Sequence, residues 1–339
     1  MNKKKVLYIG AMAMWDHILS IPFLLQLKEK WYTITLLKYH PQYFGWKLSY
    51  VFDYVSDFLY ENKLFDETLY IPYNKFKLIW FIFKNLFRFP IVYVPVKTFF
   101  STLWARLLGK KINFAVKDIN DISKYPGIVQ WLLQNKTIKN LFDYSSILKI
   151  PRDVSYIEKF WISKKFITIF PSIFERSINA AEWKNIISFL HWHDFTIVLV
   201  WWIRENWLYE DLKKYHLTNI INLCWKTDFK EIINILSDAK INISANGGIM
   251  RLGHLLNKYN ISIHITSWYV TQPPVDNIHS FNIRNYTYPC CKPCEPTHYR
   301  SDGIKWIPSC VFAWTDREAE CKKSITWEDI ILFLKKILN

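Results

Sequence analysis

The stretch Ile241-Asn-Ile-Ser-Ala-Asn-Gly-Gly-Ile-Met-Arg-Leu-Gly-His254 decides the fold of this chain. It opens with a short apolar run typical of a buried strand, and the apolar spacing of a helix follows over residues 249–257. Between them lies the pair Gly247-Gly248, which lets the backbone turn tightly and approach a ligand above the sheet. The stretch therefore predicts a strand–turn–helix unit of the Rossmann type.

Strands and helices alternate on both sides of this unit. Apolar runs in the second half predict strands at 166–170, 195–200, 219–223 and 261–265. Helices are predicted there at 179–190, 203–215, 228–238 and 326–338. In the first half, strands are predicted at 5–10, 32–37, 68–71, 91–94 and 112–116, with a helix from about 16 to 30. The polar residues between 118 and 160 lack strand periodicity, and we interpret them as helices and a linker.

This alternation predicts an α/β protein. Strands separated by helices of this length form parallel sheets with right-handed crossovers. A chain of 339 residues is long enough for two domains. We therefore predict two Rossmann-like domains, residues 1–160 and 161–339. Their parallel sheets would face a central cleft, and ligands would bind at the carboxyl ends of the strands.

Tryptophan stands in many places where glycine is expected. The chain holds 17 tryptophans and only 8 glycines, whereas an average glycine share of about 7% would give roughly 24 glycines. The tryptophans at expected turns are Trp15, Trp31, Trp192, Trp201, Trp202, Trp207, Trp225 and Trp268. Some bacterial lineages read the UGA codon as glycine, whereas common translation tables read it as tryptophan or stop. We hypothesise that many of these residues are mis-decoded glycines. The alternative is a protein genuinely rich in tryptophan, and Trp183, inside an apparent helix, is expected to be real.

The composition is that of a folded, basic protein. Hydrophobic residues make up 51% and charged residues 22% of the chain, which is enough to build full cores and excludes a disordered protein. The net charge of +15 has two interpretations: a solvated, lysine-rich surface, or attraction to phosphates of lipid headgroups, sugar nucleotides or nucleic acid. A nucleic-acid binder is disfavoured because no recognition module is present.

The sequence predicts neither a signal peptide nor a transmembrane helix. The charged start is followed by a strand pattern without a cleavage site, and no apolar run approaches 18 residues. Segment 76–107 is the most apolar, but Lys84, Arg88 and Pro90 interrupt it. It is typical of an amphipathic aromatic-basic helix followed by a strand. Packing of this helix against the domain core is the preferred interpretation, and contact with a membrane surface is the alternative.

The N-terminal stretch Ile9-Gly-Ala-Met-Ala-Met-Trp-Asp-His-Ile-Leu-Ser-Ile-Pro22 resembles the opening of the heptosyltransferase-type glycosyltransferases of family 9, which have the GT-B fold. The resemblance covers nearly the whole chain but is weak at each residue. Trp15 takes the place of a glycine, and Asp16 matches the aspartate proposed as general base in that family. The resemblance implies that Asp16 deprotonates the acceptor hydroxyl in an inverting transfer. The alternative role for Asp16 is the N-cap of the first helix.

The same family resemblance implies a donor-phosphate loop. Ser244–His254 resembles that loop, in which the backbone N–H groups around Asn246, Gly247 and Gly248 would receive the diphosphate. The chain departs from the family pattern at Asn246, Ile249 and Arg251, where aspartate, proline and histidine are usual. Arg251 would add positive charge near a phosphate, which suits stabilisation of the leaving group.

Two further segments resemble donor-binding parts of the family. In Asn222-Leu-Cys-Trp-Lys-Thr-Asp-Phe-Lys-Glu231, Trp225 again takes a glycine's place beside Lys226. Glu231 would hold the donor ribose, or it is an exposed helix charge. In Pro171–Ser177, the matching small polar and basic residues are Ser172 and Arg176, and Arg176 could equally be a solvated arginine.

The cysteines are clustered near the C-terminus: Cys290, Cys291, Cys294, Cys310 and Cys321, with Cys224 apart. A Cys-x-x-Cys with further cysteines downstream is compatible with zinc or redox pairing. The family often carries a similar stretch, however, which favours free structural thiols, and a cytoplasmic location argues against disulfides.

Together with these patterns, the resemblance implies an inverting, metal-independent glycosyltransferase of the GT-B fold. It would move a sugar from a nucleotide-diphosphate sugar, with ADP-heptose as the default, to a cell-surface glycan or lipopolysaccharide-type acceptor. No cofactor, no metal and no nucleic-acid partner are expected. The protein would be cytoplasmic, with peripheral contact at the inner membrane surface left open. The alternative is a non-catalytic sugar- or nucleotide-binding protein, favoured if the indoles at Trp15, Trp201, Trp202 and Trp225 are genuine.

Overall fold

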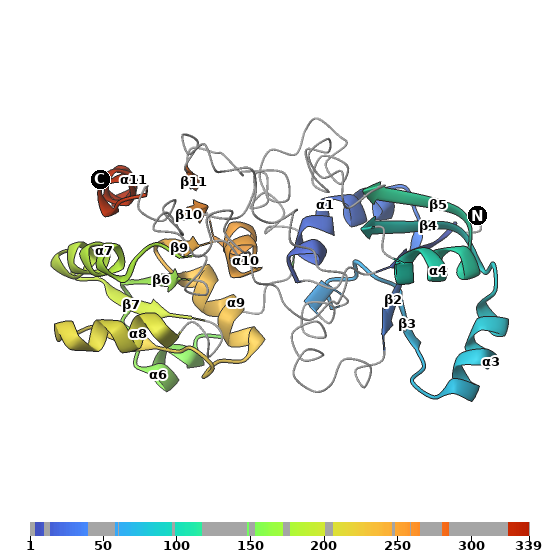
Figure 1. Cartoon of the computed structure of the whole chain (residues 1–339), viewed down its shortest axis with the longest axis horizontal. Helices are drawn as coiled ribbons and strands as arrows, with labels where there is room; N and C mark the ends of the chain where they lie inside the picture. Colours follow the sequence, from blue (N-terminus) through green and yellow to red (C-terminus); the bar gives the residue numbers. More distant parts are fainter. Residues whose placement is uncertain are drawn as a thin grey trace, which may run out of the picture. The chain divides into compact units, whose positions relative to one another are not determined.

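The computed structural model consists of two compact units, Met1–Ile138 and Lys139–Asn339 (Figure 1). Each unit is built around one parallel sheet. The structure describes residues 4–9, 14–39, 58–59, 61–96, 99–116, 148, 153–171, 177–200, 206–245, 248–257, 259–264, 280–284 and 325–338.

The N-terminal unit holds a five-stranded sheet in the order β3-β2-β1-β4-β5. The strands are β1 (Lys5–Ile9), β2 (Thr33–Tyr39), β3 (Glu67–Ile71), β4 (Phe89–Val96) and β5 (Gly109–Val116). The helices are α1 (Met14–Glu29), α3 (Lys75–Asn85) and α4 (Phe99–Leu108). From Val6 to Ile9, β1 is buried, as expected for a central strand covered on both faces.

A close approach explains the glycine at the start of β5. A Cβ atom on Gly109 would lie 2.1 Å from Val92 Cγ2 of the neighbouring β4. No side chain fits there unless the strands separate. Gly109 therefore allows β5 to pair with β4 from its first residue, where Gly109 lies opposite Phe89.

The C-terminal unit holds a six-stranded sheet in the order β11-β10-β9-β6-β7-β8. The strands are β6 (Phe166–Phe170), β7 (Thr196–Leu199), β8 (Ile220–Asn222), β9 (Asn242–Ala245), β10 (Asn260–His264) and β11 (Ser280–Arg284). The helices are α6 (Ser155–Phe160), α7 (Ala180–Trp192), α8 (Trp207–Leu212) with a 3-10 turn at Lys213–Tyr215, α9 (Phe229–Asp238), α10 (Gly248–Leu256) and α11 (Trp327–Leu338). Numbered within the unit, the order is the usual Rossmann order 3-2-1-4-5-6 read from the other end. The predicted α/β class is confirmed.

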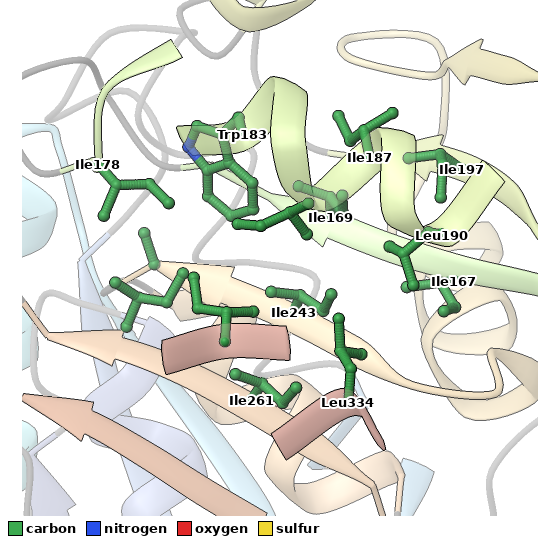
Figure 2. Close-up of a cluster of buried hydrophobic side chains, with 14 of the residues drawn as sticks. Ile167, Ile169, Ile178, Trp183, Ile187, Leu190, Ile197, Ile243, Ile261 and Leu334 are labelled. Carbon is green, nitrogen blue, oxygen red and sulfur yellow. The ribbon is translucent and has the colours of Figure 1, made fainter. Parts of the chain in front are cut away.

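The core of the C-terminal unit lies between its sheet and the helices packed on it. Isoleucines from neighbouring strands meet α7 there, as Figure 2 shows for Ile167, Ile169 and Ile243. Trp183 of α7 is fully buried among them, and its indole Nε1–H donates to Ser177 Oγ at 2.8 Å. Since its ring fills the core and its one polar group is paired, position 183 needs an indole.

Helix α6 packs against the C-terminal unit through α9. Asp153 N donates to Asn234 Oδ1 at 3.2 Å, and the Tyr156 hydroxyl donates to Asp238 at 2.8 Å. Burial, with the adjacent Asp238 carboxylate, raises the pKa of Tyr156. The units divide between Ile138 and Lys139, so α6 lies with the C-terminal unit, before the boundary that we predict at residue 160.

Helix α3 packs against the domain core through one side, as the preferred interpretation predicts. Phe81 and Asn85 are buried, and Leu78 and Ile82 pack against the same core cluster. Phe76, Trp80 and Phe83 are largely exposed. The periodicity identifies two faces of this helix, and the structure turns the less aromatic face inward. Among the described helices, none is both long and apolar enough to cross a membrane.

Candidate active site

The C-terminal sheet has one point where its strand order reverses, between β6 and β9. Across it, Ile169 lies opposite Ile243 and Phe170 opposite Ser244. Beyond β6 the chain enters Pro171 and the loop of the predicted donor residues, and beyond β9 it reaches α10 at Gly248. Ligands of open parallel sheets bind outside the carboxyl ends of the strands at such a point. The topology thus brings the connections after β6 and β9 to one edge.

The predicted donor residues after β6 and β9 divide into two groups. Ser172, Arg176, Asn246 and Gly247 lie outside the described residues, whereas Gly248 is the first residue of α10. Because the first four N–H groups of a helix have no partner within the helix, the start of α10 can receive an anion. It lies three residues after the last residue of β9.

Arg251 lies inside the unit, on the fourth residue of α10, and is buried. Burial, together with the nearby charges of Arg251 and then His264, holds the pKa of His254 well below its usual value. The His254 ring is therefore neutral at pH 7, and its Nε2 is 2.7 Å from Ser262 Oγ. Contact of Arg251 with a donor phosphate stays a prediction.

Glu231 belongs to the first turn of α9 and caps it. Its Oε2 accepts from Asp228 N at 2.8 Å, while Asp228 Oδ1 accepts from Glu231 N at 2.8 Å, which is a capping box. Its Oε1 pairs with Lys159. The interpretation of Glu231 as an exposed helix charge is wrong, because only 17% of its side chain is exposed. A carboxylate offers more lone pairs than these contacts use, so binding of a ribose hydroxyl stays a prediction.

Lys226 and Glu231 follow β8, two strands away from β6 in the sheet. Neighbouring strands lie about 4.8 Å apart, so roughly 10 Å separates β8 from β6. Lys226 is exposed, and Trp225 beside it is exposed as well.

Asp16 lies at the corresponding place in the N-terminal sheet. The strand order reverses between β1 and β4, and α1 follows β1. Because α1 begins at Met14, Asp16 is its third residue, and the N-cap role considered for it is wrong. The predicted catalytic role of Asp16 is compatible with this position.

Comparison with known proteins identifies the architecture. No protein-family model and no curated protein sequence matches the chain. The solved structure of Escherichia coli ADP-heptose lipopolysaccharide heptosyltransferase II, however, matches 98% of both chains with a TM-score of 0.66 at 15% identity. The chain has the GT-B fold.

Two further GT-B structures are similar over the same length. A glycosyl transferase of family 9 from Veillonella parvula matches 99% of this chain and 97% of its own, with a TM-score of 0.63 at 11% identity. E. coli heptosyltransferase WaaC, solved with ADP-2-deoxy-2-fluoro heptose, matches 98% and 99%, with a TM-score of 0.59 at 10% identity. The GT-B fold predicted from the family 9 resemblance is confirmed.

Several features of the structure have a weak sequence signal or one that is easily overlooked. Strand β11 is short and carries only Phe281 and Ile283 as apolar residues, so its alternation is too brief to separate from a loop. The capping box of Asp228 and Glu231 has a sequence signal, an acidic residue three positions before a glutamate ahead of an apolar run. The cysteines from Cys290 to Cys321 lie outside the described residues, and Cys224 is buried in the core.

Proposed function

We propose that this protein is a glycosyltransferase that moves a sugar from a nucleotide-diphosphate sugar to a hydroxyl group of a cell-surface glycan or lipopolysaccharide-type acceptor. The observation that carries the proposal is its likeness, over nearly the whole of both chains, to heptosyltransferases. One of these was solved with an ADP-heptose analogue. ADP-heptose is therefore the first donor to test.

In the proposed reaction Asp16 acts as the general base. It accepts the proton of the acceptor hydroxyl as the hydroxyl oxygen bonds to the anomeric carbon of the donor sugar. On the opposite side of that carbon, the bond to the diphosphate oxygen breaks. The configuration inverts, and the nucleoside diphosphate leaves with the bonding electron pair.

The C-terminal unit would bind the donor. The amide groups at the start of α10 would hold the diphosphate, and cationic side chains would offset its growing negative charge, so that no metal is needed. Glu231 would accept from a ribose hydroxyl. The residues that we assign to donor binding are Ser172, Arg176, Lys226, Glu231, Asn246, Gly247, Gly248 and Arg251.

Replacement of Asp16 tests the proposal. Turnover of ADP-heptose with a lipopolysaccharide-core acceptor would be measured by ADP release, for the native chain and for Asp16→Asn. We expect kcat to fall by about 10²- to 10⁴-fold, because a general base contributes that much, while the donor KM changes little. The control is Asp211→Asn, which removes a surface partner of Lys214 on α8. A native chain that turns over no nucleotide sugar, or an Asp16→Asn variant with native kcat, contradicts the proposal.

The non-catalytic alternative is not favoured, because the similar GT-B structures are named as transferases. The exposure of Trp225 also means that its indole does not fill the described turn after β8. Nucleotide-sugar binding without turnover of any donor would restore the alternative. We place the reaction at the cytoplasmic face of the membrane, where a lipid-linked acceptor would be available.

A further inference from the structure

Helix α3 presents an outward aromatic face, which we define as Phe76, Ile79, Trp80 and Phe83. These side chains are between 54% and 83% exposed. Their spacing of i, i+3, i+4 and i+7 places them along one side of the helix. A soluble surface rarely gathers large apolar side chains in one exposed stripe without a partner.

Basic residues border the aromatic face on both sides. With about 100° per residue, Lys77 and Lys84 lie about 40–60° from Trp80 on one side, and Lys75 lies about 40° from Ile79 on the other. No acidic residue occurs within Lys75–Asn85. The charge and the apolar stripe therefore fit the same kind of partner, one with an anionic surface above an apolar interior.

The helix is held in place to present this face. Its inner side buries Phe81, whose ring meets Trp104 of α4 edge-on with centroids 6.1 Å apart. Asn74 caps its start, because Asn74 Oδ1 accepts from Phe76 N at 2.9 Å and from Lys77 N at 3.2 Å. Figure 1 shows α3 beside α4 at the rim of the N-terminal unit. No folding of the helix on contact is required.

We propose that α3 docks the N-terminal unit on an anionic phospholipid bilayer. The aromatic face enters the boundary between headgroups and acyl chains, and the three lysines meet lipid phosphates. At eleven residues the helix is too short to span the bilayer, so it lies in the membrane surface. The inference deepens the proposed function in one respect: the docking surface would bring the enzyme to a lipid-linked acceptor.

Co-sedimentation of the full chain with vesicles tests the docking. We expect binding to mixed phosphatidylcholine and phosphatidylglycerol vesicles that weakens with salt, and much less binding to phosphatidylcholine alone. Phe76→Ser with Trp80→Ser and Phe83→Ser should weaken binding more than about tenfold. Lys75→Gln with Lys77→Gln and Lys84→Gln should weaken it by about a hundredfold on anionic vesicles.

The matched control lies on α11, where Leu332→Ser with Lys335→Gln and Lys336→Gln alters an exposed apolar residue and two lysines. It should leave vesicle binding unchanged. No binding by the native chain, or native binding by the α3 variants, overturns the docking. Asp16→Asn should bind vesicles normally, and the α3 variants should keep native turnover of a soluble acceptor. The two proposals can therefore fail separately.

A second, independent observation concerns the tryptophans. Trp31, Trp161 and Trp225 have φ angles of 61°, 56° and 65°. This left-handed region is open to glycine and unfavourable for bulky side chains. The three side chains are between 59% and 89% exposed, so core packing does not account for them.

Two of these tryptophans end helices at a position that glycine usually occupies. After α1, Trp31 N donates to Lys28 O at 2.9 Å and Tyr32 N to Leu27 O at 3.0 Å. After α6, Trp161 N donates to Glu158 O at 3.3 Å and Ile162 N to Ile157 O at 2.9 Å. This pair of bonds defines a Schellman motif, whose left-handed residue is most often glycine.

Trp225 lies in a tight turn, also at a position that glycine usually occupies. Lys226 N donates to Leu223 O at 3.0 Å, which closes a four-residue turn with Trp225 third. A positive φ at the third residue is the mark of a type II turn, which takes glycine or asparagine there. Trp183, by contrast, lies in α7 with a buried and hydrogen-bonded indole.

We infer that positions 31, 161 and 225 are glycine in the protein made by its native host, from reassigned UGA codons, and that position 183 is tryptophan. The genomic codons and peptide masses of the native protein test this. We expect UGA and glycine at the three turn positions, with UGG and tryptophan at 183. Tryptophan masses at the three turns, or glycine at 183, would overturn the inference.

Discussion

At the scale of single residues, the left-handed tryptophans carry a stability prediction. A bulky side chain in the left-handed backbone conformation costs about 1–2 kcal/mol. Because the side chain of Trp161 is exposed, removing it loses little buried apolar surface. In protein that carries tryptophan at position 161, Trp161→Gly should raise the free energy of unfolding by about 1 kcal/mol. Urea unfolding measures this, with Trp183→Gly as the opposite control, expected to lose about 3–5 kcal/mol. A destabilised Trp161→Gly variant would refute the argument.

His254 gives a pH-dependent prediction at the same scale. Burial, with Arg251 and His264 nearby, keeps its folded pKa well below the unfolded value, which is about 6.5. As the pH falls, His254 therefore binds a proton in the unfolded chain before it does so in the folded chain. The stability that neutral His254 contributes is full above about pH 6.5 and is lost as the pH falls below it.

The measurement is urea unfolding of the native chain and of His254→Gln between about pH 7 and pH 5. The native chain should lose up to about 1.4 kcal/mol per pH unit more than the variant. His216→Gln, at an exposed histidine, should follow the native curve. Identical slopes for the native chain and His254→Gln would show that His254 is not buried in its neutral form.

At the scale of elements, α9 depends on its capping box. Asp228 Oδ1 accepts a hydrogen bond from the backbone N–H of Glu231 at 2.8 Å, which satisfies a donor that has no partner within the helix. Asp228→Ala should therefore lower the free energy of unfolding by about 1 kcal/mol, whereas Asp228→Ser should stay near the native value. Chemical denaturation at pH 7 compares the two. Equal stability of all three chains would mean that the cap contributes nothing to the fold.

Helix α3 shows why an element can be predicted without its orientation. The spacing of Phe76, Trp80 and Phe83 indicates an amphipathic helix, but both of its sides are apolar enough to cover a core. Phe81 and Leu78 face inward because α4 and the sheet edge offer them contacts. Such contacts join distant parts of the sequence, and local periodicity does not contain them.

At the scale of the whole molecule, the two sheets were predictable because buried parallel strands are continuous apolar runs. The runs at Val6–Ile9 and Phe166–Phe170 became central strands. Strand order follows the usual topology of such folds, which brings the carboxyl ends of β6 and β9 side by side. The side-chain contacts between distant segments could not be predicted from the sequence. The contact between Lys159 and Glu231, for example, joins residues 72 positions apart, and it forms only because α6 packs against α9.

The strand-order reversal of the C-terminal sheet also affects how the protein is made. Thr168 of β6 bonds to Asn242 of β9, a separation of 74 residues. A ribosome adding about 5–20 residues per second needs roughly 4–15 seconds to deliver the second strand after the first. During that interval β6 has one edge bare, so the nascent chain is exposed to misassociation. The pairing that brings the carboxyl ends of β6 and β9 side by side is thus also a late, non-local step in folding.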